Sequence, residues 1–206
     1  MILVGQYGSP FVRRVAVTLN HYGIAYDRQV KSVYGDFDDV LEVNPLGKVP
    51  ALQLDGGEVL VDSALILNYL DEQAGPDAAL VPPSGPGRWR ILQRVTVAAG
   101  LSEKVVELNT ETLRRPPGMT DEERAERCRR QIMSALTWLE NDFLGPWMGG
   151  EAMTQADVTA AVAWTHMANR QPDFTDGIAG QFPALAGLAA QAEALPAFLA
   201  VPSQEG

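Results

Sequence analysis

The sequence predicts an α/β domain followed by an all-α helical domain. Over residues 1–78, short apolar runs typical of strands alternate with amphipathic helical patterns. Residues 75–87 are rich in proline and glycine and interrupt both patterns. After this segment the apolar residues recur only at helical spacing. We therefore expect a first domain at residues 1–78, a linker at 79–87 and an all-helical domain at 88–206.

The first domain is expected to run strand, helix, strand, helix, strand, strand, helix. These elements are placed at residues 2–4, 11–22, 24–30, 36–43, 49–54, 58–61 and from 63 onward. Ser9 and Pro10 favour a helix start, because serine is a preferred N-cap residue and proline is favoured at the first helical position. The run Asp55-Gly56-Gly57 indicates a hairpin turn. Two strands joined by a helix and followed by a hairpin make an α/β sheet.

The second domain shows only helical patterns. A long helix is expected over residues 88–115, where two prolines and a glycine follow. Thr120 and Glu123 predict a capping box at the start of the next helix. Thr154 and Asp157 predict another, ahead of a largely apolar helix, and a shorter helix is expected at about 183–193.

Composition excludes several classes of function. The chain has 206 residues and a formal net charge of −10, so it lacks the basic surface that nucleic-acid binding requires. Its single cysteine, Cys128, cannot form an intrachain disulfide, and with two histidines it does not make a typical zinc site. No apolar run approaches the ~20 residues of a spanning helix, and no signal-peptide pattern begins the chain. We expect a cytoplasmic protein with no metal, nucleic-acid or membrane partner.

The first turn contains the clearest chemical signal. Ser9 places a hydroxyl at the positive end of a helix, where a bound thiolate would be stabilised. From these residues alone an ordinary helix cap remains the alternative. Arg13 and Arg14 are expected on a solvated helix face, and Trp164 is expected in the core of a late helix.

Four motifs in order carry a family resemblance. They are SPFVRRV at residue 9, NPLGKVPAL at 44, VDSALILNYL at 61 and TQAD at 154. The chain resembles the cytosolic glutathione transferases over essentially its full length, most closely bacterial members of serine type. This resemblance implies a thioredoxin-like N-terminal domain, an all-helical C-terminal domain and a homodimer. It also implies glutathione as co-substrate and no tightly bound cofactor.

The resemblance also implies a role for individual residues. Ser9 would hydrogen bond to the glutathione thiol and ionise it, with Tyr7 as the rival hydroxyl. The backbone of Val49, before a cis Pro50, would pair with the cysteinyl unit, as an added strand does. A trans proline that begins an edge strand is the alternative.

Further residues would hold the two ends of the tripeptide. Asp62 and Ser63 would bind the γ-glutamyl end and Lys48 would approach the glycyl carboxylate, while Phe11 would also contact glutathione. Tyr7 and Trp164 are candidates for an acceptor pocket, with the sheet and the core as their alternatives.

The resemblance therefore implies a glutathione transferase that adds the thiolate to a small hydrophobic electrophile. Glutathione-dependent disulfide reduction or peroxidase activity is one alternative, and a non-catalytic glutathione-binding module is another. Members specialised for thiol exchange usually carry cysteine at the position of Ser9, which favours conjugation.

Overall fold

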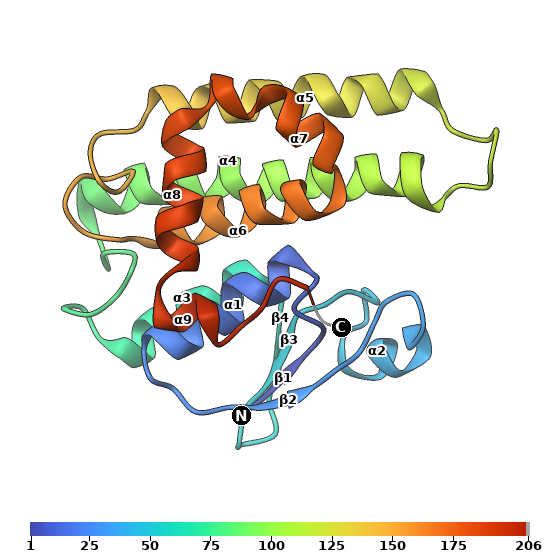
Figure 1. Ribbon diagram of the computed structural model, residues 1–206. Coiled ribbons are helices and arrows are strands. Elements are labelled where there is room, and N and C mark those ends of the chain that lie inside the picture. Colours follow the sequence, from blue (N-terminus) through green and yellow to red (C-terminus); the bar gives the residue numbers. More distant parts are fainter. Residues whose placement is uncertain (205–206) are drawn as a thin grey trace. The chain divides into compact units, whose positions relative to one another are not determined.

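The computed structural model describes residues 1–204 (Figure 1). The chain divides into two compact units, one at Pro86–Glu193 and the other formed by Met1–Gly85 with the segment from Ala194 onward. Each unit is described by itself below.

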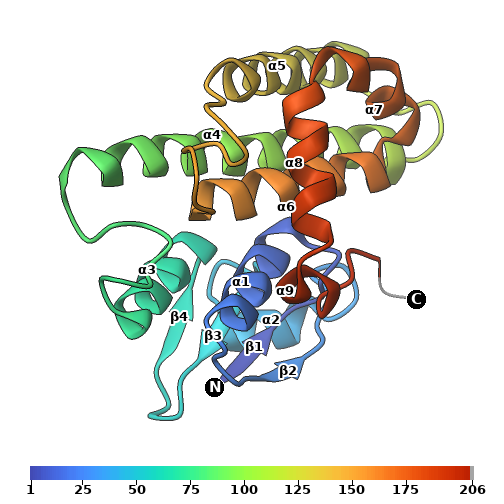
Figure 2. The same ribbon diagram turned by 60° about the vertical axis from the view of Figure 1, so that its left-hand side comes forward.

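The first unit is built on a four-stranded mixed sheet. Its strands are β1 (Ile2–Val4), β2 (Asp27–Gln29), β3 (Ala51–Gln53) and β4 (Val59–Val61), in the spatial order β2-β1-β3-β4 (Figure 2). β1 pairs in parallel with β2 and antiparallel with β3, and β3 pairs antiparallel with β4. This is the thioredoxin-like sheet that the family resemblance implied, with shorter strands than the apolar runs suggested.

Four helices complete this unit: α1 (Pro10–His21), α2 (Phe37–Val43), α3 (Ser63–Ala74) and α9 (Pro196–Leu199). α1 packs against α3, and α9 packs against α1. Residues 194–204, which were expected in the helical domain, belong to the first unit. Arg13 and Arg14 were expected in solvent, which is wrong: their exposed fractions are 2% and 4%.

The second unit is entirely helical. It contains α4 (Gly85–Asn109), the π-helical turn η1 (Thr110–Arg114), α5 (Glu122–Asn141), α6 (Gln155–Arg170), α7 (Pro172–Ile178), the 3-10 turn η2 (Ala179–Gln181) and α8 (Pro183–Glu193). α6 lies in the centre of the core, because residues 155–164 are all buried along it. Among the described residues, no helix is long and apolar enough to cross a membrane.

The two expected capping boxes had different outcomes. The box before α6 is confirmed, because the Asp157 carboxylate accepts hydrogen bonds from the backbone and hydroxyl of Thr154, each at 2.8 Å. The box at Thr120 is wrong by one residue. Asp121 is the N-cap of α5, and its carboxylate accepts from the Arg124 amide at 3.0 Å.

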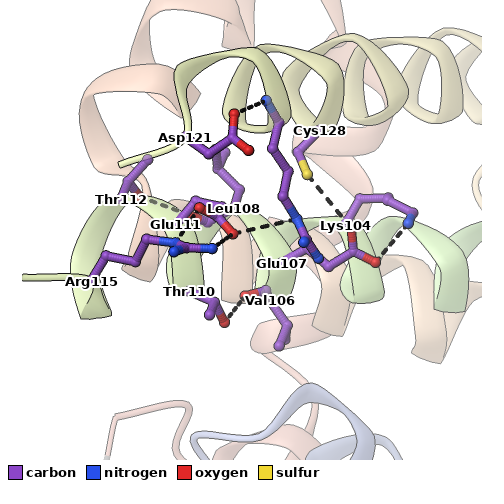
Figure 3. Close-up of polar contacts among 11 residues, drawn as sticks. Lys104, Val106, Glu107, Leu108, Thr110, Glu111, Thr112, Arg115, Asp121 and Cys128 are labelled. Carbon is purple, nitrogen blue, oxygen red and sulfur yellow. Dashed lines mark hydrogen bonds and ion pairs between the residues drawn. The ribbon is translucent and has the colours of Figure 1, made fainter. Parts of the chain in front are cut away.

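A cluster of ion pairs closes the turn between α4 and α5 (Figure 3). The buried Glu111 carboxylate lies in η1 and pairs with Arg115 at 2.5 Å and Arg124 at 3.3 Å. Beside it, Glu107 pairs with Lys104 at 2.7 Å and accepts a weak hydrogen bond from the buried Cys128 thiol at 3.7 Å. Burial and the Glu107 carboxylate raise the pKa of Cys128, which favours the protonated thiol.

Candidate functional site

The start of α1 places Ser9 where a helix exposes its positive end. The backbone of Ser9 is extended, with φ −82° and ψ 125°, and its carbonyl accepts the first helical hydrogen bond from the Arg13 amide at 2.9 Å. The Ser9 hydroxyl makes no capping hydrogen bond to the helix. The residue is therefore an N-cap by position only, because its hydroxyl oxygen accepts no hydrogen bond from an amide of the first helical turn.

Gly5 allows the end of β1, the start of α1 and the segment just before β3 to meet closely. Its φ of +135° is a conformation that side chains rarely adopt. A Cβ at this position would lie 2.5 Å from a methyl of Val12 and 3.1 Å from the Cβ of Val49. The absence of a side chain at Gly5 thus brings Val49 against the helix that Ser9 begins.

Tyr7, whose hydroxyl is the alternative to that of Ser9, contacts neighbouring side chains with both its hydroxyl and its ring. Its ring is buried, and its hydroxyl lies 2.9 Å from the hydroxyl of Tyr26. The guanidinium of Arg28 stacks on the ring, 3.7 Å from the centroid. Burial and the hydrogen bond with Tyr7 raise the pKa of Tyr26, so the Tyr26 hydroxyl stays protonated. Of the two candidate hydroxyls, Ser9 is the one whose hydrogen bonding the fold leaves open.

The turn before β3 is organised by Asn44. Its side-chain oxygen accepts from the Leu46 amide at 3.0 Å, and its side-chain nitrogen donates to the Lys48 carbonyl at 2.7 Å. Asn44 itself is buried, whereas the Lys48 side chain is exposed. The following Val49–Pro50 peptide bond is cis, as expected.

Asp62 begins α3 in an unusual backbone conformation. It has φ +70°, the one positive φ among the described non-glycine residues, and it is exposed. Its carboxylate accepts a hydrogen bond from the Ala64 amide at 2.7 Å and so caps the helix. Strained backbone conformations of this kind cluster at ligand-binding sites, where the surrounding structure holds them despite their cost in stability.

Arg14 connects α1 to the start of α3. Its Nε and Nη2 atoms donate to the hydroxyl oxygen of Ser63 at 3.0 and 2.5 Å. Both residues are buried. Sequence reasoning missed this contact, since the two residues are 49 positions apart and nothing local in the sequence links them.

The aromatic candidates lie on different units. Phe11 is partly exposed on α1, and its ring centroid is 6.0 Å from the guanidinium carbon of Arg14. Trp164 is buried on α6 of the helical unit. The contact of Phe11 with glutathione and the place of Trp164 at an acceptor pocket stay predictions. The described residues contain no group of histidine, cysteine and acidic side chains that could hold a metal ion.

Family comparison gives two matches on the chain. Residues 3–78 match the N-terminal domain of glutathione S-transferase, and residues 122–191 match its C-terminal domain. The chain belongs to the glutathione transferase family.

Solved glutathione transferase structures support this assignment over the whole length. A family member from Pseudomonas fluorescens Pf-5, with bound S-(propanoic acid)-glutathione, is 31% identical with a TM-score of 0.85 and 98% coverage of both chains. A glutathione S-transferase from Methylobacterium radiotolerans, in complex with glutathione sulfonate, is 26% identical with a TM-score of 0.89, covering 100% of this chain and 96% of the other.

Relatives known from sequence include bacterial and plant proteins. YibF of Escherichia coli K12, an uncharacterized GST-like protein, is 29% identical over 163 residues, which cover 79% of this chain and 80% of that protein. Glutathione S-transferase U7 of Arabidopsis thaliana is 26% identical over 161 residues, 78% of this chain and 67% of its own length.

Within this glutathione transferase family member, all but one of the predicted site residues belong to the first unit. Two contacts link the segments that contain them: the close approach of Gly5 to Val49, and the hydrogen bonds from Arg14 to Ser63. The exception is Trp164.

Proposed function

We propose that this chain is a glutathione transferase, which binds glutathione on its first unit and transfers the sulfur to a small hydrophobic electrophile. The observation that supports this most directly is the Ser9 hydroxyl, which stands at the N-terminus of α1 and makes no capping bond. Its rival is hydrogen bonded to Tyr26. The family match and the glutathione-bound relatives supply the ligand class.

The chemistry requires a thiolate. A free thiol has a pKa of about 8.5, so only a few per cent is ionised at neutral pH. Lowering this pKa by about 2 units requires about 2.7 kcal/mol of preferential stabilisation of the thiolate. A hydrogen bond from the Ser9 hydroxyl and the positive end of α1 together supply energies of this size. The thiol proton leaves to solvent, the sulfur forms a bond to the electrophilic carbon, and a leaving group such as chloride departs.

The two ends of glutathione fit the two other segments. The exposed Asp62 carboxylate would accept from the γ-glutamyl ammonium. The Ser63 oxygen accepts from Arg14, which directs the Ser63 proton toward another acceptor, and the glutamyl α-carboxylate at the α3 N-terminus would be that acceptor. Lys48 would reach the glycyl carboxylate, while the backbone of Val49 would pair with the cysteinyl unit.

A disulfide-exchange activity that uses a protein sulfur is disfavoured by the structure. The single cysteine is buried at 1% exposure, and its pKa is raised. A reductase or peroxidase reaction through bound glutathione alone would use the same Ser9 site, so we keep it as the alternative. We also propose, from the family, a cytoplasmic homodimer.

The test compares the two hydroxyls. Purified protein is titrated with glutathione, the ultraviolet absorbance of the bound thiolate is followed against pH, and turnover is measured with a chloronitrobenzene. We expect Ser9→Ala to lower kcat/KM by about 10- to 100-fold, the effect of one hydrogen bond to a charged sulfur. Tyr7→Phe should leave thiol ionisation in place. No binding at millimolar glutathione, or loss of ionisation only in Tyr7→Phe, would overturn the proposal.

A further inference from the structure

The last described residues of the chain form part of the first unit, where we propose that glutathione binds. We call residues Pro196 to Val201 the C-terminal strap, because they pack across α1. Two of their side chains are fully buried, Phe198 at 1% and Val201 at 0% exposure. The carbonyl of Ala197 also accepts a hydrogen bond from Asn20, at 3.4 Å.

Arg13 is the residue that joins this strap to the first turn of α1. Its Nε donates to the Val201 carbonyl at 2.9 Å, and its guanidinium carbon lies 5.6 Å from the centroid of the Phe198 ring. Its backbone amide donates to the Ser9 carbonyl at 2.9 Å. One buried residue thus holds the Ser9 carbonyl with its backbone and the C-terminal strap with its side chain.

The position of this contact matters because helix ends fray. The amides of a first helical turn lack intrahelical partners, and the turn is held mainly by what packs on it. The bond from Arg13 to Ser9 is the one that closes this turn. A buried guanidinium also requires its hydrogen-bond acceptors, so the strap and the side chain of Arg13 fix each other.

We propose that Arg13 is a positioning residue for Ser9, and that the C-terminal strap holds the first turn of α1 in the geometry that the thiolate site needs. This inference rests on the proposed function. Arg13 acts through Ser9 and does not itself contact the substrate. A hydroxyl that hydrogen bonds to sulfur depends on its placement, and displacement of a reacting group by about 1 Å has large effects on catalysis.

The experiment uses the full-length protein, an Arg13→Met variant, an Arg13→Lys variant and a chain that ends at Leu195. Arg90→Met, an exposed arginine in the helical unit, is the matched control. Two ligands are compared: glutathione, whose bound thiol is titrated by its ultraviolet absorbance, and S-methylglutathione, which fills the same site and has no thiol to ionise.

We expect Arg13→Met and the shortened chain to raise the pKa of the bound thiol by about 0.5 to 1 unit. Their dissociation constants for S-methylglutathione should stay within about twofold of wild type. Arg13→Lys keeps the charge and one donor and loses the planar group over Phe198, so its thiol pKa should rise by less. It also provides the test if Arg13→Met does not fold. Arg90→Met should match wild type in both measurements.

Two results would overturn this inference while the proposed function stands. One is an unchanged thiol pKa in Arg13→Lys and in every folded strap variant. The other is a parallel loss of affinity for both ligands, which would mean that the strap stabilises the whole unit and has no particular effect at Ser9. A wild-type protein that binds neither ligand would remove the proposed function and this inference with it.

Discussion

Three substitutions at Asp62 can measure separately its effect on the stability of the protein and its effect on glutathione binding. Its backbone has φ +70°, and its carboxylate caps α3 through the Ala64 amide. Alanine and glycine both remove the carboxylate and differ only in the Cβ atom. An L-residue at positive φ destabilises the folded state by roughly 1–2 kcal/mol, and glycine avoids this strain. Glycine also makes the unfolded chain more flexible, which offsets up to about 1 kcal/mol of that gain in stability. Asp62→Gly should therefore be about 1 kcal/mol more stable than Asp62→Ala.

Asparagine at the same position isolates the charge. Asparagine is close to aspartate in shape and caps helices as well, so Asp62→Asn should stay within about 0.5 kcal/mol of wild type. Loss of the cap should make Asp62→Ala about 1 kcal/mol less stable than wild type. Urea unfolding measures these differences. A glycine variant less stable than the alanine variant would refute the assignment of backbone strain to this residue.

Affinity for glutathione is expected to follow a different order. An ion pair at an exposed carboxylate contributes up to about 1 kcal/mol, so Asp62→Asn should weaken glutathione binding about two- to fivefold while stability is kept. Isothermal titration calorimetry provides the dissociation constants. An analogue of glutathione without the amino group is the control, since it should bind wild type and Asp62→Asn equally. Equal binding of glutathione itself would refute the contact with the ammonium.

Three further predictions concern packing, acid stability and the thiol. Gly5→Ala should destabilise the protein by about 2 kcal/mol or more in urea unfolding, because its Cβ would lie 2.5 Å from a Val12 methyl at φ +135°; a neutral effect would contradict this packing. The hydrogen bond from Arg115 lowers the pKa of Glu111 below its ordinary 4.5, so its contribution to stability is present above that pH and is lost as pH falls through the lowered value. Glu111→Gln should therefore flatten the acid limb of thermal unfolding below about pH 4.5, and an unchanged limb would contradict it. Cys128 should react with a thiol reagent only after unfolding, and rapid labelling of native protein would count against its burial.

The features that the sequence predicted well are local. The order of strands and helices in the first unit and the cap at Asp157 follow from neighbouring residues or short motifs, whereas the cis bond before Pro50 was expected only from the family resemblance. The position of Ser9 at the start of a helix is also a local prediction. The sequence could not show whether its hydroxyl makes a capping hydrogen bond, and the structure shows that it does not.

The features that it missed depend on long-range contacts. Arg13 and Arg14 were expected on the polar face of an amphipathic helix, because arginine is rarely buried unless it is paired. Their acceptors are Val201 and Ser63, 188 and 49 positions away. The hydrophobic pattern of a sequence does not reveal contacts between residues so far apart. In addition, the C-terminal strap that buries Arg13 was expected in the helical domain.

These two buried arginines are poorly explained as stabilising features. Removing a charged group from water has a large cost, and replacing a buried polar contact by apolar side chains of similar size is often neutral or stabilising. In this unit Arg13 contacts the C-terminal strap and Ser9, while Arg14 contacts Ser63 at the cap of α3. Both therefore fix the ends of helices where the proposed ligand would bind, rather than the sheet core. An apolar pair at these positions should keep the fold and lose the geometry of the thiol and γ-glutamyl sites.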